Sequence, residues 1–227
     1  MAKETKDSES LEAVESALSK TEQYIEDNQK SLTIIVLAII IIVGGYLAYQ
    51  KFYVKPLEEE AKNEIFVAEQ YFAKDSFNLA VNGRDGEFSG FIEIADDYSV
   101  TKIGNLANYY AGISYLKLGK FNEAIEYLSE FDSDDEMLAP IANGAIGDAY
   151  LELGNDNEAI SFYEKAITIS TNDFTTPIYL LKVGQVYEKQ NNLDKALKAY
   201  ERIETEFAKS REAKKAEKYK IRIELKK

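Results

Sequence analysis

A pattern of small and aromatic residues recurs three times in this chain and limits the possible folds more strongly than any other feature. In each copy a glycine is followed by a tyrosine after three residues, a small or turn-forming residue after seven and an alanine after twelve. The copies are Gly112, Tyr115, Gly119 and Ala124; Gly147, Tyr150, Gly154 and Ala159; and Gly184, Tyr187, Asn191 and Ala196. The steps of 35 and 37 residues between the glycines are typical of a solenoid of helical hairpins.

The spacing within each copy has a physical meaning. The glycine and the alanine are predicted to lie where helices A and B of a hairpin cross, because only small side chains let two backbones approach. The tyrosine lies one turn after the glycine on the same face. The second small residue follows helix A, where a left-handed residue can end a helix. The stretch after it has apolar residues at helical spacing, which predicts an amphipathic helix B.

Sequence on either side of the three copies extends the predicted solenoid. Ala68, Tyr71 and Ala80 keep the spacing and predict a fourth, degenerate hairpin. Residues 82–91, with three glycines, predict a loop before a helix near residues 91–97. The acidic run 132–136 is expected to precede and favour a helix N-terminus. Residues 206–227 are expected to form a basic helix that covers the open end.

Residues 32–49 form an uncharged apolar run. As a helix these residues span about 27 Å, close to the thickness of a bilayer core. The run follows 31 hydrophilic residues and has no clear cleavage site after it, which favours a retained anchor over a cleaved signal peptide. Lysines are nearly balanced on its two sides, so charge leaves the orientation open.

We therefore predict an all-α chain of four parts: an acidic arm at 1–31, partly helical or disordered, a transmembrane helix at 32–50, a repeat domain at 51–205 and the capping helix at 206–227. In the arm an apolar stripe is thin, and either a helix that binds a partner or disorder fits it. The stripe consists of Leu11, Val14, Leu18 and Ile25.

Composition narrows the possible functions. The net charge of −13 argues against nucleic acid as the main partner. The chain has no Cys and no His, which removes thiol nucleophiles, His-based triads and the commonest metal ligand. The spacing of Gly83, Gly86 and Gly90 lacks the Lys of a phosphate-binding loop. We expect no enzyme, no catalytic residue, no metal and no cofactor or small-molecule substrate, although a hydrolase that uses carboxylates alone is not eliminated by composition.

The three copies resemble tetratricopeptide repeats, although the Trp of that pattern is missing. Over roughly residues 20–205 the chain is similar to the YfgM-like family of ancillary subunits of the Sec translocon. The acidic arm, the apolar segment and residues 90–128 carry this resemblance. It implies a bacterial inner-membrane protein with a cytoplasmic N-terminus and a periplasmic repeat domain. It also implies an adaptor or chaperone-like role, with SecYEG, periplasmic chaperones and exported clients as partners. The alternative is a scaffold for another cell-envelope assembly.

In this repeat class helix A lines the ligand groove, so each copy offers candidate protein-binding positions. Most of them are apolar, which suits an extended or helical segment of another protein. Packing against a neighbouring repeat or against the capping helix is the competing interpretation. The positions are Leu106, Tyr109, Ile113 and Leu116 in the first copy, Ile141, Asp148 and Leu151 in the second, and Ile178, Leu181, Gln185 and Glu188 in the third.

Overall fold

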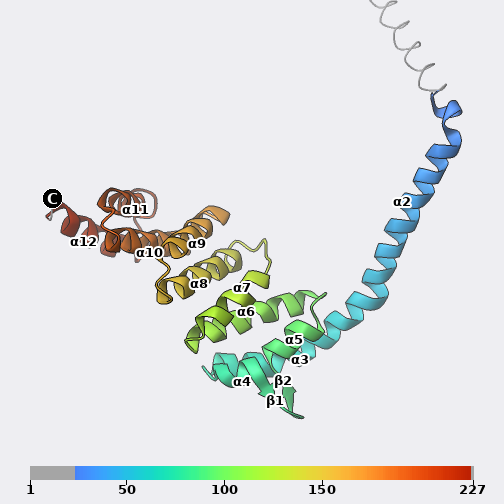
Figure 1. The fold of residues 1–227 in the computed structure, drawn as a ribbon, viewed down its shortest axis with the longest axis horizontal. Coiled ribbons are helices and arrows are strands. Elements are labelled where there is room, and N and C mark those ends of the chain that lie inside the picture. Colours follow the sequence, from blue (N-terminus) through green and yellow to red (C-terminus); the bar gives the residue numbers. More distant parts are fainter. Residues whose placement is uncertain (1–23, 226–227) are drawn as a thin grey trace, which may run out of the picture. The chain divides into compact units, whose positions relative to one another are not determined.

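The computed structural model describes residues 24–225 (Figure 1). The chain divides into two compact units after Pro56. The first unit contains α2 (Gln29–Tyr49) and the π-helical segment Gln50–Val54. No residue of α2 is buried. Its apolar stretch has the length and composition of a membrane span or of a signal sequence. The predicted arm falls largely outside the described residues.

The second unit is built almost entirely from helices, which confirms the predicted fold class. Its helices are α3 (Lys55–Ala73, which begins just before the unit boundary), α4 (Phe77–Asn82), α5 (Phe91–Asp97), α6 (Lys102–Lys117), α7 (Phe121–Glu130), α8 (Leu138–Glu152), α9 (Asp156–Ile169), α10 (Thr176–Lys189), α11 (Leu193–Glu206) and α12 (Ala213–Glu224). Consecutive helices pair as hairpins and stack along the chain, with α12 at the C-terminal end (Figure 1).

The same turn ends the first helix of all four hairpins. One residue in each turn has a positive φ, namely Asp75 (56°), Gly119 (72°), Gly154 (79°) and Asn191 (59°). The next residue donates its backbone N–H to the carbonyl of the tyrosine five residues earlier, at 2.8 or 2.9 Å, in every case. This arrangement satisfies a carbonyl that the helix end would otherwise leave unpaired. The degenerate copy, α3 with α4, is therefore a hairpin of the same kind as the other three.

The stretch predicted as a loop contains a short antiparallel ladder instead, formed by β1 (Gly83–Arg84) and β2 (Phe88–Ser89). Two glycines make the ladder possible, because the backbones meet where a side chain would not fit. A Cβ on Gly83 would lie 2.4 Å from the nitrogen of Gly90. The helix expected after this stretch is α5, with the predicted bounds.

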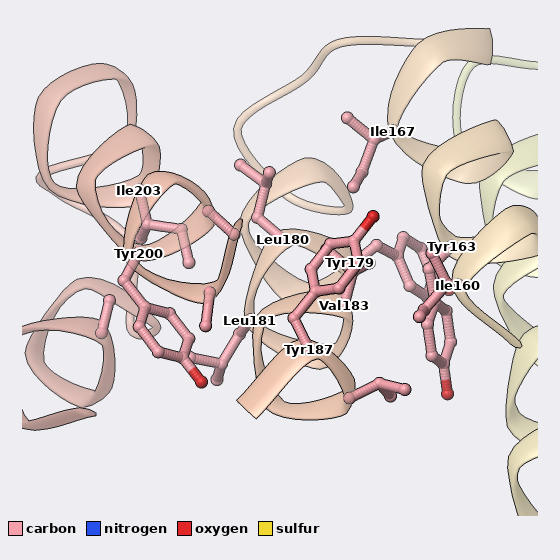
Figure 2. Close-up of a cluster of buried hydrophobic side chains, with 14 of the residues drawn as sticks. Ile160, Tyr163, Ile167, Tyr179, Leu180, Leu181, Val183, Tyr187, Tyr200 and Ile203 are labelled. Atoms are coloured by element: carbon pink, nitrogen blue, oxygen red, sulfur yellow. The ribbon is translucent and has the colours of Figure 1, made fainter. Parts of the chain in front are cut away.

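The largest hydrophobic cluster surrounds α10, which lies between α9 and α11 (Figure 2). Tyr163 and Ile167 approach α10 from α9, and Tyr200 and Ile203 approach it from α11 (Figure 2). The cluster continues into α12, whose Ala216 and Ile223 are fully buried. The C-terminal helix therefore covers the apolar end of the solenoid, as a solenoid requires.

Two side chains organise the loops that join successive hairpins. Before α8, the carboxylate of Asp135 accepts hydrogen bonds from the backbone N–H groups of Met137 and Leu138, both at 2.8 Å. These bonds hold the pKa of Asp135 below its ordinary value. Before α10, the amide oxygen of Asn172 accepts from the backbone N–H groups at positions 174 and 175, at 2.9 and 2.8 Å. The acidic run thus favours the start of the next helix, as predicted.

Candidate protein-binding face

Each of the three repeat glycines lies against a large side chain of the following helix. A side chain at these positions would collide with that neighbour, so glycine sets the distance between the two helices. The pairs, with the distance from an added Cβ to the nearest side-chain atom, are Gly112 and Leu128 (2.4 Å), Gly147 and Tyr163 (2.7 Å), and Gly184 and Tyr200 (2.5 Å).

The other repeat-packing residues lie mostly inside the hairpins. The alanines of helix B, Ala124, Ala159 and Ala196, are fully buried. Tyr115 and Tyr187 are also buried. Tyr150 is half-buried, and its ring stacks on Phe162 with centroids 5.5 Å apart. The small residues therefore lie at helix contacts, where the spacing places them.

A polar cluster forms where α8, α9 and α10 meet. The hydroxyl of Tyr163 donates to Asp148 at 2.6 Å, and the ammonium of Lys182 lies 2.6 Å from both carboxylate oxygens of Asp148. Lys182 also lies over the rings of Tyr163 and Tyr179, at 5.7 and 5.6 Å from the centroids. Burial and the nearby Asp148 carboxylate raise the pKa of Tyr163. The cluster fixes α8 against α10 through charge and ring contacts together.

The last helix makes similar polar contacts with α10. Gln185 donates to the hydroxyl of Tyr219 at 3.1 Å, and Arg222 donates to Glu188 at 2.6 Å. Each of these pairs is separated by 34 residues, as Asp148 and Lys182 are. The equal separation shows that α12 takes the place that helix A of a further repeat would occupy. Two of the predicted binding positions, Gln185 and Glu188, therefore contact the capping helix.

A hollow lies between the starts of α8 and α10 and the segment that joins α11 to α12. Its volume is about 930 Å³. Phe174, 72% exposed, projects at this site from the loop before α10. We call this hollow the Phe174 groove; it is lined by Met137, Ile141, residues 173–175, Ile178, Tyr179 and residues 205–212.

The predicted binding positions separate into three groups. Ile141 and Ile178 line the Phe174 groove. A smaller hollow of about 280 Å³ brings together Asp148, Leu151 and Gln185. The remaining positions mostly make contacts within the protein. Tyr109, Ile113 and Leu116 pack on hydrophobic clusters that include residues of α8, and Leu106 is half-buried. Leu181 is buried in the cluster around α10, and Glu188 pairs with Arg222.

Sequence reasoning missed three residues that shape this face. Gly144 lies against the ring of Tyr179, and a Cβ there would be 1.9 Å from a ring carbon. Lys182 pairs with Asp148, and a search for opposite charges one repeat apart would have found it. Phe174 lies between two repeats, where the repeat pattern specifies no residue type. Its only signal is an aromatic side chain in a polar loop.

Comparison with known proteins agrees with this geometry. Residues 106–134 and residues 138–205 each match a model of the tetratricopeptide repeat. The chain carries tetratricopeptide repeats. Tetratricopeptide repeats are a protein–protein interaction scaffold, so the helix-A side of the stack is a candidate protein-binding face.

One solved structure shows the same fold. The crystal structure of MamA protein aligns with a TM-score of 0.50 at 23% identity, over 65% of this chain and 73% of that one. A second crystal structure of MamA aligns with a TM-score of 0.42 at 24% identity, over 60% of this chain and 90% of that one. No curated protein matches the sequence. Within residues 24–225, no group of three or more His, Cys, Asp or Glu side chains is placed to hold a metal ion.

Proposed function

We propose that this tetratricopeptide-repeat protein is a membrane-anchored adaptor that holds a segment of another protein in the Phe174 groove. The observation that carries the proposal is the exposure of three large apolar side chains around one hollow. Phe174 is 72% exposed, Met137 39% and Ile178 38%. Exposed apolar side chains gathered at a concave site are typical of protein-interaction surfaces.

The chemistry of the groove indicates the kind of segment that it binds. Its lining offers apolar contacts from Ile141, Ile178 and the ring of Tyr179. The lining also carries both signs of charge, with Asp173 and Glu206 acidic and Lys209 and Arg211 basic. A groove of this composition suits a peptide whose apolar side chains enter it while its polar groups remain at the rim. Binding of this kind needs no catalytic group, cofactor or metal.

The apolar helix supports the membrane part of the proposal. The large apolar side chains from Ile34 to Val43 are at least half exposed, and none is buried by the described residues. An apolar stretch of this length that no other part of the domain covers is stable in lipid, where a helix satisfies its own backbone. We infer that α2 anchors the protein and is not removed as a signal sequence.

The finer assignment rests on the resemblance to the YfgM-like family. We propose that the anchor lies in the bacterial inner membrane, with the N-terminus in the cytoplasm and the repeats in the periplasm. The partners are then Sec translocon subunits, periplasmic chaperones and exported chains, and the role is chaperone-like. A scaffold for another envelope assembly would use the same groove for a different partner.

Crosslinking from the groove tests the proposed partner. A photoreactive amino acid replaces Ile178 in the full chain, and the matched control carries it at Ser161, which is exposed on α9. We expect crosslinks to SecYEG subunits or exported chains in intact cells from position 178 and few from position 161. Crosslinks from position 178 to another envelope assembly would favour the scaffold role. Equal crosslinking from both positions would contradict binding in the groove.

A charge in the anchor tests the membrane assignment. Ile39→Arg places a cation near the centre of the apolar run, at a cost of about 2.5–3.5 kcal/mol on insertion scales. We expect a large loss of protein from the membrane fraction, with Asn122→Arg on α7 as the surface control. Protease protection of the repeats in spheroplasts then reports their side of the membrane. Removal of α2 from the mature protein would exclude the anchor.

A further inference from the structure

The outer face of α12 is basic and has no partner within residues 24–225. Ala216 and Ile223 point into the protein, and the opposite side of the helix carries Lys214, Lys218, Ile221 and Leu225, with Lys215 beside them. All five of these side chains are exposed; Ile221 is 46% and Leu225 83% exposed. We call these five residues the outer face of α12.

The cations of the outer face differ from the other cations of the same helix. Lys220 pairs with Glu204 and Arg222 pairs with Glu188, so both serve to attach α12 to the repeats. Lys214, Lys215 and Lys218 form no ion pair with any described residue, although the domain around them is acidic. Residues 51–204 contain 14 basic and 28 acidic residues, whereas residues 205–227 contain 9 and 4. Positive charge is therefore concentrated in the C-terminal segment, and Lys214, Lys215 and Lys218 contribute cations that no described residue pairs.

We propose that the outer face of α12 docks on a membrane surface that contains anionic lipid. Unpaired lysines attract a diffuse layer of negative headgroups, and exposed Ile221 and Leu225 between them can enter the headgroup boundary. Lysine is a flexible point charge and suits such a layer, whereas fixed carboxylates of a protein partner favour the planar fork of Arg. Glu217 and Glu224 lie on one flank of the helix and leave this stripe free of acidic residues.

The proposal rests on the anchor proposed above, which holds the domain beside a bilayer. Tethering makes docking an intramolecular step, so a weak electrostatic contact is enough to populate it. Each lysine near an anionic surface changes the docking equilibrium by roughly fivefold, and three lysines by roughly a hundredfold. Docking should weaken as salt screens the attraction.

The test uses the full chain in vesicles of phosphatidylcholine, with or without phosphatidylglycerol. The chain has no native Cys, so Glu217→Cys places one environment-sensitive dye on the flank of the outer face. Flotation with neutral vesicles first establishes that α2 holds the protein in lipid; failure at this step overturns the anchor and the docking proposal with it. We expect a blue shift and quenching by lipid-attached quenchers only with phosphatidylglycerol, reversed by high salt. Glu158→Cys on α9 reports a site that should not respond.

Matched charge variants decide the role of the lysines. Lys214→Gln, Lys215→Gln and Lys218→Gln together should abolish the response to phosphatidylglycerol. Lys102→Gln, Lys117→Gln and Lys198→Gln remove the same charge from exposed positions elsewhere and should leave the response unchanged. A protein that floats but shows no response to phosphatidylglycerol would overturn the docking proposal alone. An equal response in neutral vesicles would also overturn it, and so would an equal loss of the response in the two triple variants. A response that appears only after an acidic protein is added would overturn it as well.

Discussion

The hairpins α6–α7 and α8–α9 solve the same packing problem with different side chains. Gly112 meets Leu128 in the first hairpin, and Gly147 meets Tyr163 in the second. Leucine ends inside the hairpin, whereas the hydroxyl of Tyr163 continues to Asp148 on helix A. The same backbone crossing is therefore apolar in one repeat and joined to a charged cluster in the next.

The difference extends to the face that each repeat presents. In α6 the helix-A positions Tyr109, Ile113 and Leu116 pack against α8 and its neighbours. In α8 and α10 the corresponding region carries the Asp148–Lys182 pair. In the first repeat, the side chain at the helix crossing, Leu128, has no polar group that reaches the surface. In the second repeat, the side chain at the crossing, Tyr163, is hydrogen-bonded to the Asp148–Lys182 pair. A ligand that contacts Asp148 or Lys182 would also affect the packing of α9 through Tyr163.

Gly147→Leu should have the largest effect on stability, because it overfills the helix crossing of the second repeat. The new side chain would collide with the ring of Tyr163 and displace it from Asp148. We expect a loss of about 3 kcal/mol or more and a fall in Tm of roughly 6–12 °C. Ser161→Leu adds the same side chain on an exposed site and should change Tm little. Circular dichroism or calorimetry measures Tm, and an unchanged Tm for Gly147→Leu would refute the role of this glycine.

Tyr163→Phe sharpens the comparison, because it makes the second repeat resemble the first. It removes a hydrogen bond to a carboxylate and leaves the ring in place. We expect a loss of about 1–3 kcal/mol in urea unfolding. Tyr115→Phe in the first repeat is the control, since the hydroxyl of Tyr115 has no hydrogen-bond partner within residues 24–225. Equal effects of the two substitutions would show that the hydroxyl of Tyr163 contributes nothing beyond its ring.

Alkaline pH should lower stability in part through the buried tyrosines of the second region. Burial, with help from Asp148 or Glu164, raises the pKa of Tyr163, Tyr179 and Tyr187 above the ordinary value. Their unfolded forms lose the proton near pH 10, so the stability that they contribute is complete below that pH and is lost as pH rises above it. We expect the urea midpoint to fall above pH 10, and to fall less in Tyr163→Phe. A fall of the same size in both proteins would contradict a special role for Tyr163.

The sequence predicted the parts of the fold that repeat. The glycine, tyrosine and alanine spacing predicted the hairpins, and the residues that follow helix A have positive φ as expected. The binding positions were harder to predict, because a repeat pattern describes what each hairpin shares and not what differs between hairpins. Phe174 lies in a loop that joins two hairpins, outside the repeat pattern. The contact of Gln185 with Tyr219 depends on the position of α12 against α10, which the pattern does not specify. The binding role of these positions stays a prediction.

The smallest effect is expected at the loops that join the hairpins, where Asp135 and Asn172 accept equivalent hydrogen bonds at the approach to successive A helices. Only Asp135 titrates. Its pKa is lowered in the folded protein, so its contribution to stability is present above the unfolded pKa and is lost as pH falls below about 4. Asp135→Asn keeps an accepting oxygen and should remove this part of the acid sensitivity while it changes stability little at neutral pH.

The reciprocal exchange tests the same comparison from the other loop. Asn172→Asp should introduce acid sensitivity at α10, although Asp cannot replace the bonds that the Asn172 amide donates to the carbonyl of Glu136 and the hydroxyl of Thr175. The measurement is the difference in unfolding midpoint between each variant and the unmodified protein, from neutral to acid pH. This difference reports the contribution of one carboxyl group, because the other carboxyl groups are the same in both proteins. A difference that stays constant with pH for Asp135→Asn would mean that the charge of Asp135 does not act on the helix, and that the two loops differ only in composition.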